Sequence, residues 1–198
     1  MADRVGDIIG DYRAFAAKQQ ARLLDRGIDI SSYALSHLAV RVSEWDDYVR
    51  VRDQLEKHAV INSENVWNGR PISLIVLAEP LVVLDGKQVP LIELIPPVHQ
   101  RVYKMGLEHL GVVVGDGFDD FVETNKPVLT GQQFQGPSSN PDPVYILFED
   151  FTHVKFYRLS LRASVEQDAG PFPDGFRHVA DWVPQRLVTA TGPNPLPR

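Results

Sequence analysis

The feature that most constrains this chain is an internal repeat. Residues 36–42 (SHLAVRV) return 72 residues later as residues 108–114 (EHLGVVV). A matching acidic and aromatic segment follows each copy, DDYV at 46–49 and DDFV at 119–122. A chain that repeats a strand-then-helix opening predicts two copies of one module, related by a pseudo-twofold axis. Such an axis would bring His37 and His109 together, so the first hypothesis is a shared metal site.

Composition narrows the function classes. The chain has 198 residues, 43% of them apolar, and a net charge of -6, which is typical of an ordinary globular protein of one or two domains. No cysteine is present, which excludes disulfides, thiolate ligands and cysteine nucleophiles. The acidic balance, with scattered Lys and Arg, predicts no nucleic-acid partner. The apolar runs 72–77 and 89–95 are too short for a membrane span, so we expect a cytoplasmic protein without a membrane partner.

Hydrophobic periodicity predicts the order of the elements. One amphipathic helix is expected over 3–26. The first module then reads as a strand at 35–42, a helix at 44–57, a hairpin around Asn68 and Gly69 with a strand at 72–77, and a last strand at 89–95 after the turn at 85–87. The second module reads as a strand at 107–114, a helix at 118–125, a Gly/Pro/Ser-rich excursion at 131–143, and strands at 144–148 and 153–161.

The expected fold is therefore α+β, built from paired βαβββ modules. An N-terminal helical segment would occupy residues 1–30, the first module 31–100 and the second 101–162. An irregular, Pro-rich tail would occupy residues 163–198, with Phe172, Phe176 and Trp182 as possible anchors to the core.

Strand alternation selects the candidate ligands. It places His37 and Arg41 on the face opposite the apolar residues of the first strand, and Glu93 on the same face as Leu91 and Ile95 in the last strand. A carboxylate within so apolar a strand is costly to bury without a cation. Two histidines and one carboxylate are the ligand set of Fe(II) facial triads, and similar sets bind Zn²⁺, Ni²⁺ or Mn²⁺. A single strand histidine is usually only a half-buried side chain, but two at equivalent repeat positions favour a divalent metal.

Other polar residues are weaker candidates. Arg41 could clamp a substrate carboxylate, and so could Arg70, although a turn arginine more simply pairs with a nearby acidic residue. In the last strand of the second module, Lys155 and Tyr157 occupy the place that corresponds to Glu93, so Tyr157 could be a fourth ligand or a hydrogen-bonding phenol. The remaining histidines have no equivalent in the repeat; they are His58, His99, His153 and His178. The simplest expectation for His153 is an exposed side chain.

Six segments between residues 30 and 162 form a recognisable set: SHLAVR at 36–41, ENVWNGRPI at 64–72, EP at 79–80, IEL at 92–94, LEH at 107–109 and VKF at 154–156. In these segments the chain resembles the YecM family of the vicinal oxygen chelate superfamily. It implies paired βαβββ modules that curl into a cleft, with His37, Glu93 and His109 at the metal-ligand positions. Tyr157 stands where this family often has a histidine, which favours an open site with three protein ligands.

The resulting hypothesis is a metal-dependent enzyme whose ion chelates two neighbouring oxygens of a small oxyacid or carbonyl substrate. Arg41 and Arg70 would orient the anionic group, and Tyr157 would donate a proton or fill the fourth position. An Fe(II) oxygenase and a Zn²⁺ or Ni²⁺ isomerase or lyase fit the ligands equally well. The alternative from another class is a non-catalytic small-ligand or metal-binding module. Either would act on a small molecule as a monomer or homodimer.

Overall fold

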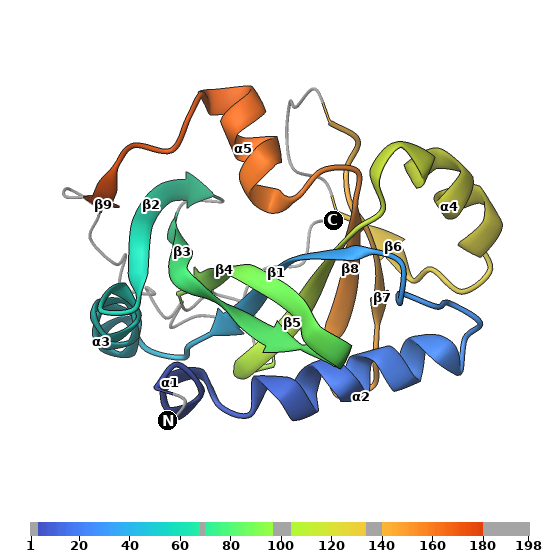
Figure 1. Cartoon of the computed structure of the whole chain (residues 1–198), viewed down its shortest axis with the longest axis horizontal. Helices are drawn as coiled ribbons and strands as arrows, with labels where there is room; N and C mark the ends of the chain where they lie inside the picture. Colours follow the sequence, from blue (N-terminus) through green and yellow to red (C-terminus); the bar gives the residue numbers. More distant parts are fainter. Residues whose placement is uncertain (1–3, 68–69, 97–103, 134–139, 180–198) are drawn as a thin grey trace, which may run out of the picture.

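A single nine-stranded sheet organises the chain in the computed structural model, which describes residues 4–67, 70–96, 104–133 and 140–179. The strand order is β6-β7-β8-β5-β1-β4-β3-β2-β9. Helix α2 runs along one side of the strands and α5 lies on the other (Figure 1). The predicted α+β class is confirmed.

Both modules follow the predicted βαβββ order. The first contains β1 (Ala34–Arg41), α3 (Trp45–Glu56), β2 (Ala59–Trp67), β3 (Arg70–Val83), the 3₁₀ turn η1 (Leu84–Gly86) and β4 (Lys87–Ile95). The second contains β5 (Gly106–Val113), the 3₁₀ turn η2 (Gly115–Gly117), α4 (Phe118–Asn125), β6 (Gly131–Gln132), β7 (Val144–Leu147) and β8 (His153–Tyr157). The predicted Asn68-Gly69 turn and part of the 131–143 excursion lie outside the described residues.

The pairing of strands repeats with the modules. In each one, the first strand pairs in parallel with the last: Ala39 is opposite Glu93 in the first module, and Gly111 is opposite Lys155 in the second. The two first strands, β1 and β5, pair antiparallel with each other and join the modules. This junction is the pseudo-twofold contact that the repeat predicted.

The sheet separates two apolar clusters. The larger one contains Leu38 and Val40 of β1, packed with residues of the helices such as Tyr48 and Phe121. The smaller one, on the other face, contains Ala39. The rest of its buried members are Ile72, Leu74, Val76, Leu91, Ile95, Leu161 and Phe172. The alternation predicted for β1 and β4 is therefore confirmed, and the site residues share the face of the smaller cluster.

The prediction of one N-terminal helix over residues 3–26 is wrong. The chain forms α1 (Gly6–Ile9) and α2 (Tyr12–Leu24), and between them Gly10 has a φ of 94°, in the left-handed region that ends helices. Asp11 caps α2 by accepting a hydrogen bond from the Ala14 N–H at 2.9 Å. The spacing of apolar residues suggested one helix because α1 and α2 both pack on the same core.

The helices are short. The longest among the described residues, α2, has 13 residues, whereas a membrane-spanning helix needs about 20. Within the described ranges, no helix is long and apolar enough to cross a membrane.

The prediction of an irregular tail from residue 163 is wrong for its first part. Residues Leu161–Ala169 form α5, which Ser160 caps by accepting a hydrogen bond from the Ala163 N–H. Gly175–Arg177 form β9, which pairs in parallel with the outer edge of β2. Both elements are stabilised by contacts with strands that are far away in the sequence. The prediction missed α5 because its sequence is mostly polar and has no clear apolar periodicity. Residues 180–198 lie outside the described part of the chain.

Of the predicted tail anchors, one is confirmed. Phe172 is 7% exposed and belongs to the smaller apolar cluster. Phe176 is 46% exposed, so that part of the prediction is wrong. Trp182 lies outside the described residues.

Candidate metal centre

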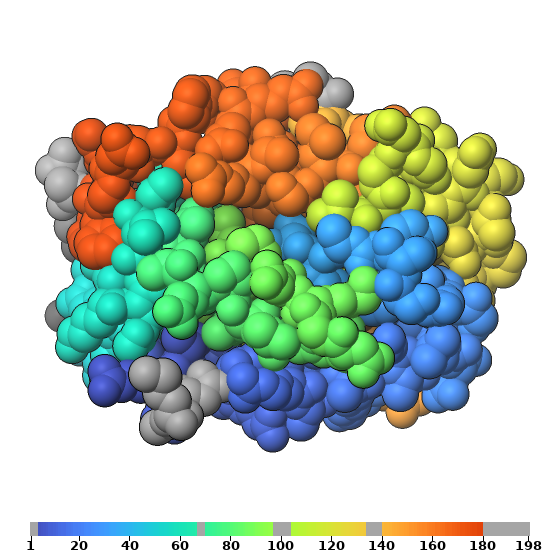
Figure 2. Space-filling model, in the orientation of Figure 1, coloured from blue at the N-terminus to red at the C-terminus, as the bar shows by residue number. Residues whose placement is uncertain are grey.

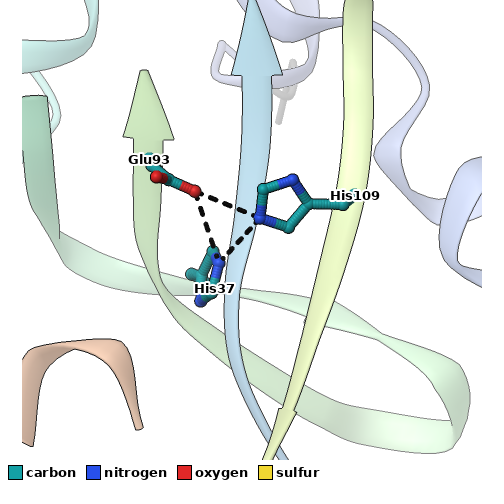
Figure 3. Close-up of side chains that lie close together, drawn as sticks. All are labelled: His37, Glu93 and His109. Atoms are coloured by element: carbon teal, nitrogen blue, oxygen red, sulfur yellow. Dashed lines mark hydrogen bonds and ion pairs between the residues drawn. The ribbon is translucent and has the colours of Figure 1, made fainter. Parts of the chain in front are cut away.

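The structure brings the three predicted ligands together from three adjacent strands (Figure 3). His37 lies on β1, Glu93 on β4 and His109 on β5. The Nε2 atoms of the two histidines are 3.1 Å apart, and Glu93 Oε2 lies 3.1 Å from His109 Nε2 and 3.6 Å from His37 Nε2. Both imidazoles are fully buried, while the Glu93 side chain is 14% exposed.

Small residues make this convergence possible. Across the β1–β5 pair, His37 is opposite Gly111, and Ala39 is opposite His109. A Cβ added to Gly111 would lie 2.5 Å from the His37 ring, closer than real Cβ atoms come to their neighbours. Gly111 follows His109 by two residues, and Ala39 follows His37 by two residues. Each histidine therefore lies against the small residue of the other module.

The spacing of the three atoms fits a metal ion. Bonds of about 2.1 Å separate neighbouring ligand atoms by about 3.0 Å at a right angle and about 3.4 Å at a tetrahedral angle. The two observed edges of 3.1 Å lie within this range, and the third, 3.6 Å, is about 0.2 Å longer than its upper end. Glu93 Oε2 is also buried without a hydrogen bond of good geometry among the described residues. An acceptor in this situation is stabilised by a cation.

The hydrogen-bond partners of the rings favour the same conclusion. His109 Nδ1 lies 3.3 Å from Glu108 Oε1, and a carboxylate only accepts, so this nitrogen carries the proton and Nε2 offers a lone pair. His37 Nδ1 lies 2.9 Å from Ser36 Oγ, which also accepts the Leu161 N–H at 2.8 Å. His109 Nε2 then meets the Glu93 oxygen either through a second ring proton, which is the contact that lowers the pKa of Glu93, or through a metal cation in its place.

Protonation states also suit metal binding. Burial lowers the pKa of His37 to about 3, although the charge of Glu93 opposes the shift. Burial alone would raise the pKa of Glu93, but its contact with His109 and the charge of Lys155 outweigh burial and lower the pKa. A neutral imidazole and an ionised carboxylate are the forms that bind metals.

Arg41, expected to clamp a substrate, lies against Glu108. Its Nε and Nη2 donate to the two carboxylate oxygens, with Nη2 3.1 Å from Oε1, and both side chains are buried. Burial would raise the pKa of Glu108, but the contacts with His109 and Arg41 outweigh it and lower the pKa. Arg41 therefore holds Glu108 in position, and Glu108 in turn orients His109 through Nδ1.

In the structure Lys155, rather than Tyr157, is the counterpart of Glu93. Glu93 is opposite Ala39 in its module, and Lys155 is opposite Gly111, the residue equivalent to Ala39. Lys155 is 8% exposed, and burial lowers its pKa while the charges of Glu93 and Glu108 oppose that shift. The repeat predicted both Lys155 and Tyr157 at this point. The register of β8 against β5 shows that Lys155 is the equivalent residue.

Tyr157 lies beside the centre, two residues further along β8. Its ring is 5.4 Å from the His37 ring, edge to face, and only 5% of the residue is exposed. Burial, followed by the charge of Glu93, raises the pKa of this phenol well above its usual value of 10.0. A neutral phenol is a hydrogen-bond donor and a poor metal ligand.

The expectation of an exposed His153 is wrong. The residue is half-buried, and its ring stacks on His109 at 4.6 Å between centroids with an interplanar angle of 25°. Although Glu108, His109 and His153 lie close together, stacked imidazoles direct their lone pairs in parallel planes. These three residues therefore do not converge on a second ion. His153 faces His109 because the two are paired between β5 and β8, which the sequence could not specify.

Arg70 is not part of the cluster. It begins β3, on the same face as Ile72 and Leu74, and Leu74 is the residue paired with Glu93. Four residues of strand separate Arg70 from that point, roughly 13 Å. Its predicted role in substrate binding stays a prediction.

Helix α5 covers this face of the sheet. Its first residue, Leu161, donates its N–H to Ser36 Oγ and packs with Ala39 and Phe172 in the smaller apolar cluster. Figure 2 shows the segment through α5 and β9 along the top of one face, next to the strands of the first module. Sequence reasoning missed Ser36, which links α5 to the His37 ring. Its only signal was its place before the repeated histidine.

Comparison with known proteins extends these observations. The YecM protein family matches residues 4–168. Protein YecM of Escherichia coli K12 is 32% identical over 181 residues, which span 84% of this chain and 95% of that protein. A Haemophilus influenzae protein described as uncharacterized is 35% identical over 104 residues, 52% of this chain and about half (54%) of that protein's length. A solved structure described as structural-genomics protein EC4020 has a TM-score of 0.64 at 24% identity, over 82% of this chain and 92% of that one. This last likeness concerns the fold alone.

Proposed function

The chain belongs to the YecM family, and from that membership and the geometry of the centre we propose a metal-dependent enzyme of the vicinal oxygen chelate type. Its substrate would be a small oxyacid or carbonyl compound held through two neighbouring oxygens. The convergence of His37 Nε2, His109 Nε2 and Glu93 Oε2 within 3.1–3.6 Å carries this proposal.

In this proposal His37, Glu93 and His109 hold one divalent ion, Fe(II), Zn²⁺, Ni²⁺ or Mn²⁺. When bound, the ion supplies a Lewis acid that polarises two neighbouring substrate oxygens. An oxygenase based on Fe(II) and an isomerase or lyase based on Zn²⁺ or Ni²⁺ use the same three ligands. The nature of the ion separates these reactions.

The surrounding side chains prepare the ligands. The buried Arg41–Glu108 pair keeps the proton of His109 on Nδ1, and the Ser36 hydroxyl orients the His37 ring through a hydrogen bond to its Nδ1. We propose this positioning role for Arg41 because two of its three guanidinium nitrogens already donate to Glu108. The neutral phenol of Tyr157, whose ring contacts the His37 ring, would donate a hydrogen bond or a proton to a ligand beside His37. Arg70 would meet only a substrate that extends along β3.

One observation favours the alternative of a non-catalytic binding module. Both histidine side chains are fully buried, and α5 packs over their face of the sheet. Structural metal sites are closed, whereas catalytic sites keep an open position for water or substrate. Turnover of small hydroxy and keto acids by protein loaded with each ion would distinguish the two functions.

Metal affinity tests the proposal directly. We expect the parent protein to bind one divalent ion per chain, and Glu93→Gln to weaken that affinity by more than about 100-fold, since it removes a charged ligand while preserving shape. His58→Ala is the matched control, because that histidine lies at the end of α3, outside the cluster, and should bind the ion as the parent does. Elemental analysis and calorimetric titration measure both. Equal occupancy in Glu93→Gln and the parent would remove Glu93 from the ligand set.

A further inference from the structure

The two modules present opposite charges at equivalent points. Glu93 is paired with Ala39 in the first module, and Lys155 is paired with Gly111 in the second. A symmetric centre would have a carboxylate at both points and four protein ligands. Lysine at the second point leaves three ligands and places a cation beside them.

The neighbours of Lys155 show that it faces the centre. On β8 the side chains of residues 153, 155 and 157 share one face. His153 stacks on His109, and Tyr157 contacts the edge of His37, so Lys155 lies between two residues that touch the two histidine ligands. Its cross-strand partner is Gly111, and the His37 ring lies directly against Gly111, so Lys155 stands beside that ring.

Among the residues that the structure describes, the buried charges around the centre cancel without an ion. Glu93 and Glu108 are balanced by Arg41 and Lys155, while the histidine ligands bind metals as neutral rings. A divalent ion would add two positive charges to this buried group. Uncompensated buried charge is costly, so the loaded centre is stabilised by an anion.

We propose that Lys155 makes the metal-loaded centre selective for anions, by binding an anionic oxygen of the same molecule whose neighbouring oxygens the metal holds. The inference rests on the proposed function and narrows its substrate class to carboxylates and related small oxyanions. Lys155 is then a specificity-determining residue, and the lysine also keeps a fourth protein ligand out of the centre.

Binding of Mn²⁺ followed by oxalate tests the inference without an activity assay. Lys155→Met keeps the length of the side chain and removes its charge. We expect it to bind Mn²⁺ at least as tightly as the parent, because a nearby positive charge is gone. Calorimetric titration of oxalate into the Mn²⁺-loaded variant should show an affinity at least about tenfold lower than in the parent, after subtraction of oxalate binding to free Mn²⁺.

Two further variants complete the design. Lys126→Met makes the same chemical change on an exposed lysine next to α4 and should leave both affinities within about twofold of the parent. Lys155→Arg retains the charge and should preserve most of the oxalate affinity. If Lys155→Met does not fold, as judged by circular dichroism, Lys155→Gln replaces it with the same expected result.

The possible failures are distinguishable. A parent protein that binds no divalent ion overturns both the proposed function and the anion selectivity. A parent that binds Mn²⁺, with oxalate affinity unchanged in Lys155→Met, overturns the anion selectivity alone. Loss of Mn²⁺ affinity in Lys155→Met would show that the lysine supports the ligands instead of selecting the anion, which also overturns the inference.

Discussion

The first module places Glu93 beside the paired histidines, whereas the second places Lys155 at the equivalent point of its last strand. The strand order within the two modules is the same, and so is the pairing of each first strand with its last. The order and pairing of the strands are therefore the same in both modules, while the side chains that face the centre differ. The proposed metal site is therefore asymmetric: both modules would supply ligands, and only the second supplies a lysine.

The side chains that hydrogen-bond to Nδ1 of the two histidines also differ between the modules; we call them the supports of the histidines. In the first module the Nδ1 partner is the neutral hydroxyl of Ser36, which also accepts an N–H from α5. In the second it is the carboxylate of Glu108, which is held by the buried Arg41. A charged support binds its proton more strongly, so the His109 ring is held by electrostatics and the His37 ring by packing and a neutral hydrogen bond.

Strand length separates the modules as well. β2 and β3 have 9 and 14 residues, whereas β6 and β7 have 2 and 4. The long β2 offers an edge on which β9 pairs, and the chain between β8 and β9 crosses the site face as α5. The first module thus provides the anchor for the segment that covers the centre.

The largest expected effect comes from the charged support. Glu108→Gln removes the negative charge that pairs with the buried Arg41, so we expect a loss of about 3–5 kcal/mol in the free energy of unfolding. Ser36→Ala, the equivalent change in the first module, should cost only about 1–3 kcal/mol. Chemical denaturation measures both.

A double variant sharpens this comparison. In Arg41→Met combined with Glu108→Gln, the uncompensated charge is gone, so we expect a smaller loss than the sum of the two single losses. Strictly additive losses would show that the pair is not coupled, and equal losses for Glu108→Gln and Ser36→Ala would remove the difference between the two supports.

The next effect tests the reciprocal packing of histidines and small residues. Gly111→Ala places a methyl group against the His37 ring, and we expect it to cost about 1–3 kcal/mol and to weaken metal binding. Gly117→Ala is the matched control, since its added Cβ meets nothing within 4 Å and should leave metal affinity unchanged. Thermal denaturation and metal titration of both variants measure the difference. Unaltered metal affinity in Gly111→Ala would mean that the position of the His37 ring is not decisive.

The smallest expected effect concerns Tyr157, whose place in the first module belongs to the apolar Ile95. Tyr157→Phe makes this position apolar, as it is in the first module. We expect the free energy of unfolding to change by about 1 kcal/mol or less and the metal affinity to stay almost unchanged. Turnover or ligand affinity should fall, because the donor phenol is lost. Tyr157→His should instead tighten the metal by adding a ligand. If Tyr157→Phe strips the metal in elemental analysis, the phenolate is itself a ligand and the three-ligand centre is wrong.

Much of the centre was predictable because it depends on local rules. The repeat identified His37 and His109 as equivalent, and alternation in an apolar strand separated Glu93 from its neighbours. Side-chain direction in a strand follows from backbone geometry alone, so no tertiary information was needed. The same rule placed Leu38 and Val40 in the core.

The contacts across strands could not be predicted in this way. The choice of Lys155 over Tyr157 as the counterpart of Glu93 depends on the register of β8 against β5. The burial of Arg41 on Glu108 joins residues 67 positions apart, and the stacking of His153 on His109 depends on the same register. A shift of one residue would turn each of these side chains to the other face.

The sequence by itself determined the two modules, the order of their elements and the three residues that converge at the junction, because periodicity and repetition are written in the order of residues. Only the tertiary structure decided which charges face those residues, that α5 covers them, and that β9 extends the sheet at β2. These features arise from pairing and packing between distant segments. Their free energy depends on what each segment meets in the folded chain and not on its own composition.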